Sequence, residues 1–210
     1  MQMREFFNLA FQFFILLTPF AVLSAFLSMT QDYTRQERFR VAIKTGIATV
    51  ISCVALFYFG NFIFMLFGIG IDAFRIGGGT ILFLNAIGLV RGNGNGNGSA
   101  RAAEGKENPE DYDDIAVVPL AIPITVGPGT TAALIVMGAD LTEWMPMIRN
   151  LSSLLLAIAA LTLLLTLGNK AEEILKRKGI TIISKVTGLF LSAFAAQMIF
   201  QGIKNLLFPA

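Results

Sequence analysis

The chain has 210 residues, of which 55% are hydrophobic and only 14% are Asp, Glu, Lys or Arg. A soluble domain usually carries about 25% charged residues, so this composition excludes an ordinary soluble protein. Histidine is absent, which removes haem ligation, common zinc sites and proton relays that use histidine. Cys53 is the single cysteine and excludes an internal disulfide. The net charge of +2 gives no indication of a nucleic-acid partner.

Long uncharged stretches alternate with charged segments along the chain. The length of each uncharged stretch is close to that of a helix that crosses about 30 Å of hydrocarbon, which needs about 20 residues. They lack the period-2 alternation of barrel strands, so they must be helices. The sequence therefore predicts an all-α integral membrane protein, with the first span retained. The six expected transmembrane helices are residues 6–28, 41–67, 73–90, 115–138, 148–168 and 184–206.

Residues 91–114 form a different kind of segment, with alternating Gly and Asn followed by charged residues. Such a composition cannot bury apolar surface, so we expect a flexible cytoplasmic linker. A phosphate-binding loop is the alternative, but no strand precedes the glycines and no Lys-Ser/Thr pair follows.

The distribution of Lys and Arg predicts the orientation in the membrane. Basic residues concentrate in 35–44, 91–106 and 170–185, whereas the opposite connections hold few. The positive-inside rule then places both termini outside the cytoplasm, and Trp144 fits an anchor at the outer interface. Arg75 and Lys185 are expected to snorkel at span starts, and Asp72 to be solvated.

Two motifs recur in the same order at a spacing of about 110 residues. Thr18-Pro19 corresponds to Gly127-Pro128, and the segment 75–78 corresponds to 185–188. Chance alignment of apolar helices is the alternative. An odd number of spans in each half makes the second half enter the membrane in the opposite sense. We therefore expect two inverted three-helix repeats, residues 1–90 and 115–210, an architecture common in secondary transporters.

Proline within a helix removes a backbone hydrogen bond and clashes with the preceding turn. Spans one and four each contain such a proline near mid-membrane. A half-helix that starts there offers free N–H groups and partial positive charge to a substrate carboxylate. Simple kinks are the alternative. The expected binding residues at the two breaks are Thr18, Pro19, Phe20, Gly127, Pro128, Gly129, Thr130 and Thr131.

Polar side chains within the spans form a second set of candidates, because polar groups in lipid usually face the bundle interior. Ser24, Asn85, Ser192 and Gln197 would line a substrate path. Ordinary hydrogen bonding between helices is the alternative. Gly77, Gly78 and Gly79 are expected to serve close helix packing.

The chain resembles the MarC/SnatA family of membrane proteins. The resemblance rests on Pro-Leu-Ala-Ile-Pro at 119–123 with Gly-Pro-Gly at 127–129, on 67–79, and on 179–188 continuing to Gln197 and Gly202. It implies six spans in a prokaryotic cell membrane and, for some members, transport of small neutral amino acids. The family often has Asn where Thr18 stands and usually Arg where Lys185 stands, so specificity could differ.

Together these observations predict a secondary transporter of small neutral amino acids, such as alanine or glycine, that works by alternating access as an exporter or exchanger. A passive small-solute channel and a membrane scaffold are the alternatives. No enzyme activity is expected, because no span contains paired acids or a serine with a base. No cofactor or metal is expected. The expected partners are the amino acid, the lipid bilayer and a second copy in a homodimer.

Overall fold

The computed structural model describes residues 2–31, 33–68, 70–91, 116–139 and 143–208. The predicted linker at 91–114 lies almost wholly outside these ranges. The described residues form helices joined by short turns. The helices are α1 (Gln2–Leu16), α2 (Pro19–Met29), α3 (Arg35–Phe67), α4 (Ile71–Arg91), η1 (Ala116–Thr125), α7 (Pro128–Ala139), α8 (Trp144–Thr166) and α9 (Gly168–Leu207).

Four of the described helices are long and apolar enough to cross a membrane: the Arg35–Phe59 part of α3, α4, α8 and the Lys178–Leu207 part of α9. Helices α1 and α2 together make a fifth candidate, bent by 43° at its break. The expected fourth span is divided into η1 and α7, and only the short apolar helix Pro128–Gly138 is recognised there. The described part of the chain is thus an all-helical membrane protein with four or five candidate spans.

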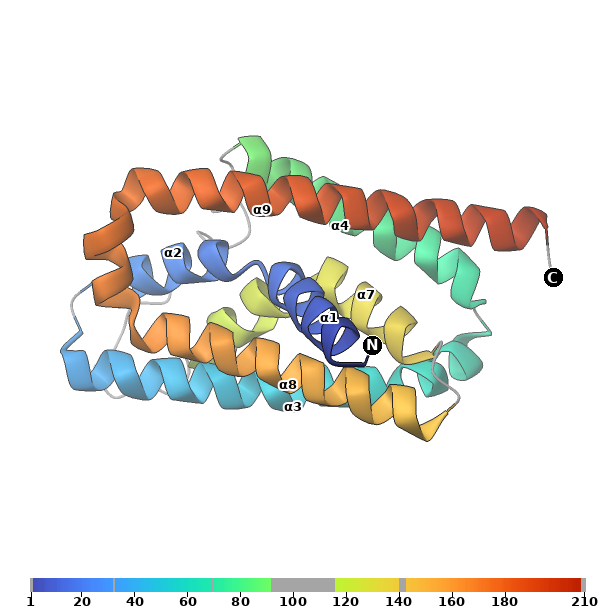
Figure 1. Cartoon of the computed structure of the whole chain (residues 1–210), viewed down its shortest axis with the longest axis horizontal. Helices are drawn as coiled ribbons and strands as arrows, with labels where there is room; N and C mark the ends of the chain where they lie inside the picture. The colour runs from blue at the N-terminus through green and yellow to red at the C-terminus, as the bar shows by residue number, and fades with distance from the viewer. Residues whose placement is uncertain (1, 32, 69, 92–115, 140–142, 209–210) are drawn as a thin grey trace.

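The long helices lie along one common axis (Figure 1). Helix α4 packs along α9 and α3 packs along α8, while the broken segments lie between these pairs. Helix α1 contacts α8, α2 contacts α9, and α7 contacts both α3 and α4. Each broken segment is therefore held by helices from the other half of the chain.

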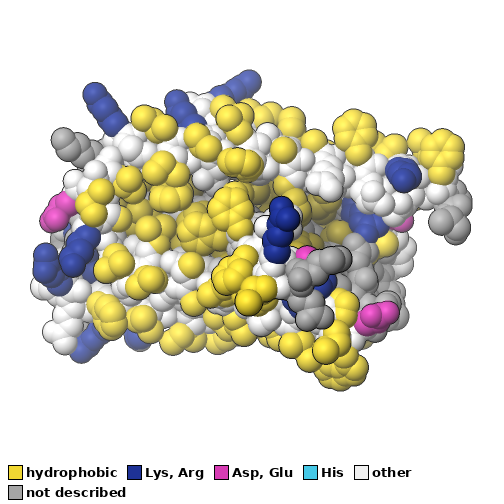
Figure 2. All heavy atoms as spheres, viewed as in Figure 1, with side chains coloured by type: hydrophobic (Ala, Val, Ile, Leu, Met, Phe, Trp, Pro, Cys, Tyr) yellow, Lys and Arg dark blue, Asp and Glu magenta, His cyan; other side chains and the backbone are white. Residues whose placement is uncertain are grey.

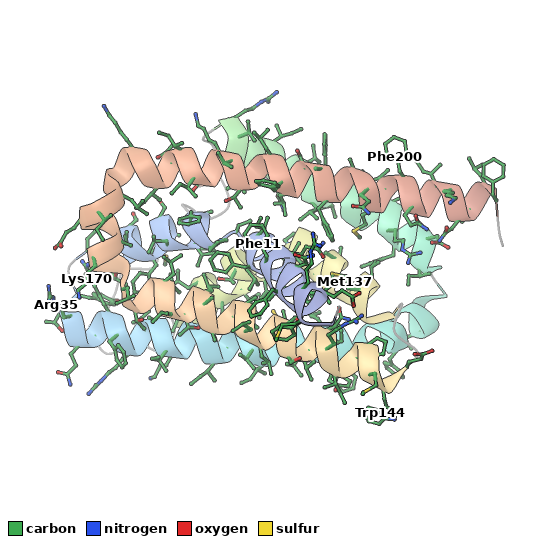
Figure 3. The ribbon with its side chains drawn as sticks, in the orientation of Figure 1. Phe11, Arg35, Met137, Trp144, Lys170 and Phe200 are labelled. Carbon is green, nitrogen blue, oxygen red and sulfur yellow. The ribbon has the colours of Figure 1, made fainter. Side chains whose placement is uncertain are left out.

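The surface has the character expected of a membrane protein. Hydrophobic side chains cover much of the face in Figure 2, whereas Lys and Arg gather mainly at one end and along the adjoining edge. Arg35 and Lys170 lie at that end, and Trp144 lies near the other (Figure 3). The start of α1 and the end of α9 both lie toward the Trp144 end (Figure 1).

Helix α9 differs from the expectation of a separate loop between spans five and six. It begins at Gly168, directly after α8, and remains helical for 40 residues (Figure 1). Residues 170–178 are rich in Lys, Glu, Leu and Ala, which are strong helix formers. Hydropathy marks where a helix leaves the membrane, but it does not mark where that helix ends.

Glycine permits close contacts between α4 and its neighbours. A Cβ at Gly78 would overlap the Cβ of Ala132 in α7, and one at Gly79 would lie 3.1 Å from the Ala195 carbonyl oxygen in α9. The packing role is confirmed for these two glycines. Gly77 is different, because nothing lies within 4 Å of the position that its Cβ would take.

A polar cluster joins the start of α4 to the end of α9. Arg75 donates to Asp72 Oδ1 at 2.5 Å, and Asn205 Nδ2 donates to the same oxygen at 3.0 Å. Arg75 is only 8% exposed. The expectation of a snorkelling Arg75 and a solvated Asp72 is therefore wrong: the helical spacing of three residues pairs their charges, and α9 covers the pair.

The break between α1 and α2 depends on one residue with unusual backbone geometry. Thr18 occupies the N-cap position of α2 with φ 47° and ψ 55°, the left-handed region, and Pro19 is the first helical residue. The Thr18 side chain makes no capping hydrogen bond. A β-branched residue is strained in this region, whereas Asn and Gly tolerate it.

We expect the Gly78→Ala substitution to lower the free energy of unfolding by about 2 kcal/mol, because α4 and α7 must move apart. Thermal unfolding of the purified protein measures the change. Gly77→Ala is the matched control and should be neutral or stabilising by up to about 1 kcal/mol, since Ala favours helix and meets no neighbour there. Equal effects of the two variants would contradict the close contact.

Thr18→Asn should raise the free energy of unfolding by about 1 kcal/mol, because Asn relieves the left-handed strain. The same unfolding measurement applies. Thr18→Val is the control, since it removes the hydroxyl but keeps the β-branched strain and should give no gain. A gain for Val equal to that for Asn would assign the effect to the hydroxyl instead.

Candidate functional site

The two helix breaks meet inside the bundle. The Thr130 hydroxyl, in the first turn of α7, donates to the Leu16 carbonyl oxygen at the end of α1 over 3.2 Å, and this contact is buried. The two residues are 114 positions apart. Figure 1 shows α1, α2 and α7 together in the middle of the bundle. The hydrogen bond gives the Leu16 carbonyl, left free by the break, a partner.

Both half-helices that start at the breaks leave backbone N–H groups without acceptors. In α2, Ala21 and Val22 donate to the Thr18 carbonyl, but the Phe20 N–H has no acceptor among the described residues. In α7, Thr131 donates to the Gly127 carbonyl over 2.8 Å, and the amides of Gly129 and Thr130 have no acceptor there. These free donors lie at the positive ends of the helix dipoles.

The segment before α7 is wound more widely than an α-helix. Helix η1 is a π-helix, and the Val126 N–H donates to the Ala121 carbonyl, five residues back, over 2.9 Å. The Thr125 hydroxyl follows the same spacing and donates to the Leu120 carbonyl over 2.7 Å. Prolines 119 and 123 supply no N–H to this helix. The break at Gly127 therefore has carbonyl groups on one side and N–H groups on the other.

Helix α4 closes one side of the α7 start. A Cβ at Gly129 would lie 2.9 Å from Leu82 Cα and 3.2 Å from Asn85 Nδ2. The Asn85 side chain thus lies beside the Gly129 backbone, which glycine allows to approach closely. Asn85 is exposed and makes no hydrogen bond to the described residues, so its amide is free to bind a ligand.

The remaining predicted residues lie at various distances from the breaks. Phe20 is half-buried against the core, and Ser24 is half-buried one turn farther along α2. The Ser192 hydroxyl donates to its own helix, at the Leu189 carbonyl over 2.8 Å. Gln197 is exposed on α9. No hydrogen bond among the described residues joins Ser192 or Gln197 to the two breaks.

Thr45 and Thr49 were not among the predicted site residues. Both lie in α3, both are fully buried, and neither hydroxyl has a hydrogen-bond partner among the described residues. Their spacing of four residues in an uncharged span was a signal in the sequence, but burial without a partner is visible only in three dimensions.

The arrangement offers hydrogen-bond donors and acceptors in an apolar bundle. Among the described residues, no three His, Cys, Asp or Glu side chains come together as they would to hold a metal ion. Free N–H groups, hydroxyls and one amide suit the binding of a small, overall neutral polar molecule better than that of an ion of high charge.

Comparison with known proteins agrees with this architecture. The model of the MarC family integral membrane proteins matches residues 3–207. The UPF0056 membrane protein MJ1677 of Methanocaldococcus jannaschii is 34% identical over 204 residues, which cover 97% of this chain and 98% of that protein.

Bacterial relatives are similar over nearly the same length. YhcE of Escherichia coli is 30% identical and the alignment covers 97% of this chain and 95% of YhcE. YvbG of Bacillus subtilis is 32% identical, with 93% and 92% covered. Both are named as UPF0056 membrane proteins. No solved structure matches the chain. The chain belongs to the MarC family of multi-pass integral membrane proteins, which has members in bacteria and archaea.

Proposed function

We propose that this protein is a secondary transporter of small neutral amino acids, with alanine and glycine as the first substrates to test. The observation that carries the proposal is the hydrogen bond from Thr130 to the Leu16 carbonyl, which joins two broken helices at one place. Broken helices that meet near mid-membrane are the usual substrate site of secondary transporters.

The substrate carboxylate would bind the free N–H groups of Phe20, Gly129 and Thr130. Two half-helix starts provide these groups, and their dipoles favour negative charge. The substrate amine would then need acceptors rather than an acid. The Asn85 side-chain oxygen and the Thr18 hydroxyl are near the breaks and make no hydrogen bond to the described residues.

None of the described residues 16–20 and 126–131 at the breaks is charged, and this favours a zwitterion. A cationic drug would need an acid to offset desolvation, and an anionic solute would need a base. The close approach of Gly129 to Leu82 leaves little room beside the α7 start, which favours a small side chain.

Alternating access would use two inverted halves with six spans, counting η1 with α7 as the fourth. Exchange of the halves would turn α1 into η1, α2 into α7, α3 into α8 and α4 into α9. The observed contacts support this relation: α1 packs on α8 as η1 packs on α3, and α2 packs on α9 as α7 packs on α4. The pairs α4–α9 and α3–α8 are each unchanged by the exchange. Rocking of one half against the other would expose the breaks alternately.

The protein would act as an exporter or exchanger in the prokaryotic cell membrane, with both termini outside the cytoplasm, where the ends with fewer basic residues lie. It would need no cofactor and catalyse no chemical reaction. A homodimer is part of this proposal.

Proteoliposomes that contain the protein should take up labelled alanine or glycine saturably, and unlabelled alanine should compete. Thr130→Val should reduce the uptake rate about tenfold, because it loosens the junction of the two breaks and removes a hydroxyl beside the free N–H groups. Ser152→Ala is the control and should leave uptake unchanged, since Ser152 is exposed on α8 and its hydroxyl donates to its own helix.

The alternatives predict different results in the same assay. Flux that neither saturates nor responds to competitors would indicate a passive channel. No flux above that of empty liposomes, for several small amino acids, would reject the transporter and favour a scaffold.

A further inference from the structure

Two buried hydroxyl groups in α3 lack the partners that such groups normally find. Thr45 and Thr49 are 0% exposed, and neither Oγ1 atom forms a hydrogen bond within the part of the chain that the structure describes. Buried polar atoms are rarely left without a partner, and each exception needs an explanation.

Other helical threonines in this protein satisfy their hydroxyls locally. Thr80, Thr162 and Thr187 each donate to the carbonyl four residues earlier, over 2.7–2.9 Å. This is the usual behaviour of threonine in a membrane helix. Thr45 and Thr49 do not follow it, because neither hydroxyl bonds to the carbonyl oxygen four residues earlier.

Two elements lie against α3 at this level: α8, whose Thr162 side chain a Cβ at Gly46 would overlap, and the break in the fourth expected span. Helices α3 and α7 run in the same direction (Figure 1), and a Cβ at Gly138 would overlap the Phe57 carbonyl. Thr49 precedes Phe57 by the same number of residues as Thr130 precedes Gly138. At 1.5 Å per residue, Thr49 is level with Thr130. Thr45 lies one turn earlier in α3, and η1, which ends just before the break, also contacts α3.

The end of η1 supplies further oxygen atoms. The last carbonyls of any helix lack intrahelical donors, and they carry the negative end of its dipole. The two hydroxyls and these carbonyls form a neutral, oxygen-rich set within an apolar bundle. Hydroxyls and unwound carbonyls of this kind coordinate Na⁺ in transporters with broken helices.

We propose that Thr45, Thr49 and the terminal carbonyls of η1 form a binding site for a sodium ion. A neutral donor set favours a monovalent ion, because the cost of burying a charge without counter-charge rises steeply with its magnitude. Calcium sites, by contrast, are built largely from carboxylates. Thr45 and Thr49 lie in the uncharged segment 45–71, and the first acid after it is Asp72.

The position of the site gives it a role in transport, and this role rests on the proposed function. The break at Gly127 presents carbonyls to the ion and the N–H groups of α7 to a substrate carboxylate. The ion and the carboxylate would attract each other across a few ångströms of low dielectric. Each would therefore raise the affinity for the other, which is the coupling that drives transport against a gradient.

Thermal unfolding of the purified full-length protein tests ion binding directly. Sodium chloride replaces choline chloride at constant ionic strength, with potassium chloride as a second comparison. We expect the wild-type Tm to rise by about 3 °C at a sodium concentration ten times Kd, and the rise to saturate. Potassium should give a smaller rise.

Variants assign the rise to the two hydroxyls. The double variant Thr45→Val with Thr49→Val should lose the sodium response, while its Tm in choline equals or exceeds that of the wild type, because unpaired buried hydroxyls have been removed. Thr45→Ser with Thr49→Ser keeps the oxygens and should restore the response. Thr187→Val is the buried control, since its hydroxyl already has a partner, and it should respond as the wild type does.

Several outcomes would overturn the site. A wild-type Tm that does not respond to sodium would leave a buried water as the occupant. A response that does not saturate, or that survives in the double valine variant, would also reject it. Alanine uptake tests the transporter independently. A rise in Tm with sodium but no uptake supports the ion site and contradicts the transporter. Uptake with no effect of sodium on Tm supports the transporter and contradicts the ion site.

Discussion

Hydrocarbon offers no hydrogen-bond partners, so a chain that lies in it must satisfy its own backbone groups. Two prolines in this chain prevent that, because Pro19 and Pro128 each remove a donor where a helix would otherwise continue. The two breaks lie together, and the Thr130 hydroxyl donates a hydrogen bond to the Leu16 carbonyl. The surrounding helices follow from this: each broken segment packs on helices of the other half, which shield the irregular backbone from the surroundings.

Close packing supports the same arrangement at the interfaces of α4. Gly78 and Gly79 let α7 and α9 approach its backbone, and Gly202 brings α9 near the Asp72 carbonyl. The Asp72–Arg75–Asn205 cluster then joins α4 and α9 at their ends. Because α4 and α9 belong to different halves of the chain, we expect any rocking of the halves to pivot at this closely packed interface.

Hydropathy was enough to predict an all-helical membrane protein and the positions of α3, α4 and α8, because uncharged length is a property of sequence alone. Proline marked both breaks, because its missing N–H is also a property of sequence alone. The sequence could not predict that α9 continues from α8 without a loop, since a segment of charged residues outside a span can be either a helix or a loop. It also missed the left-handed backbone of Thr18 and the unpartnered Thr45 and Thr49, which depend on how distant helices pack.

The position of Thr18 connects strain with the proposed mechanism. A residue held in a strained conformation persists when its surroundings require it, and such residues concentrate where a protein changes shape. Thr18 separates α1 from α2, and the N–H groups beyond it are those proposed to bind substrate. The MarC/SnatA resemblance implies Asn at this position in many members, which adopts the left-handed region readily. If the break is a hinge, Thr stores strain there that Asn would not, and the balance between two states of the transporter would differ accordingly.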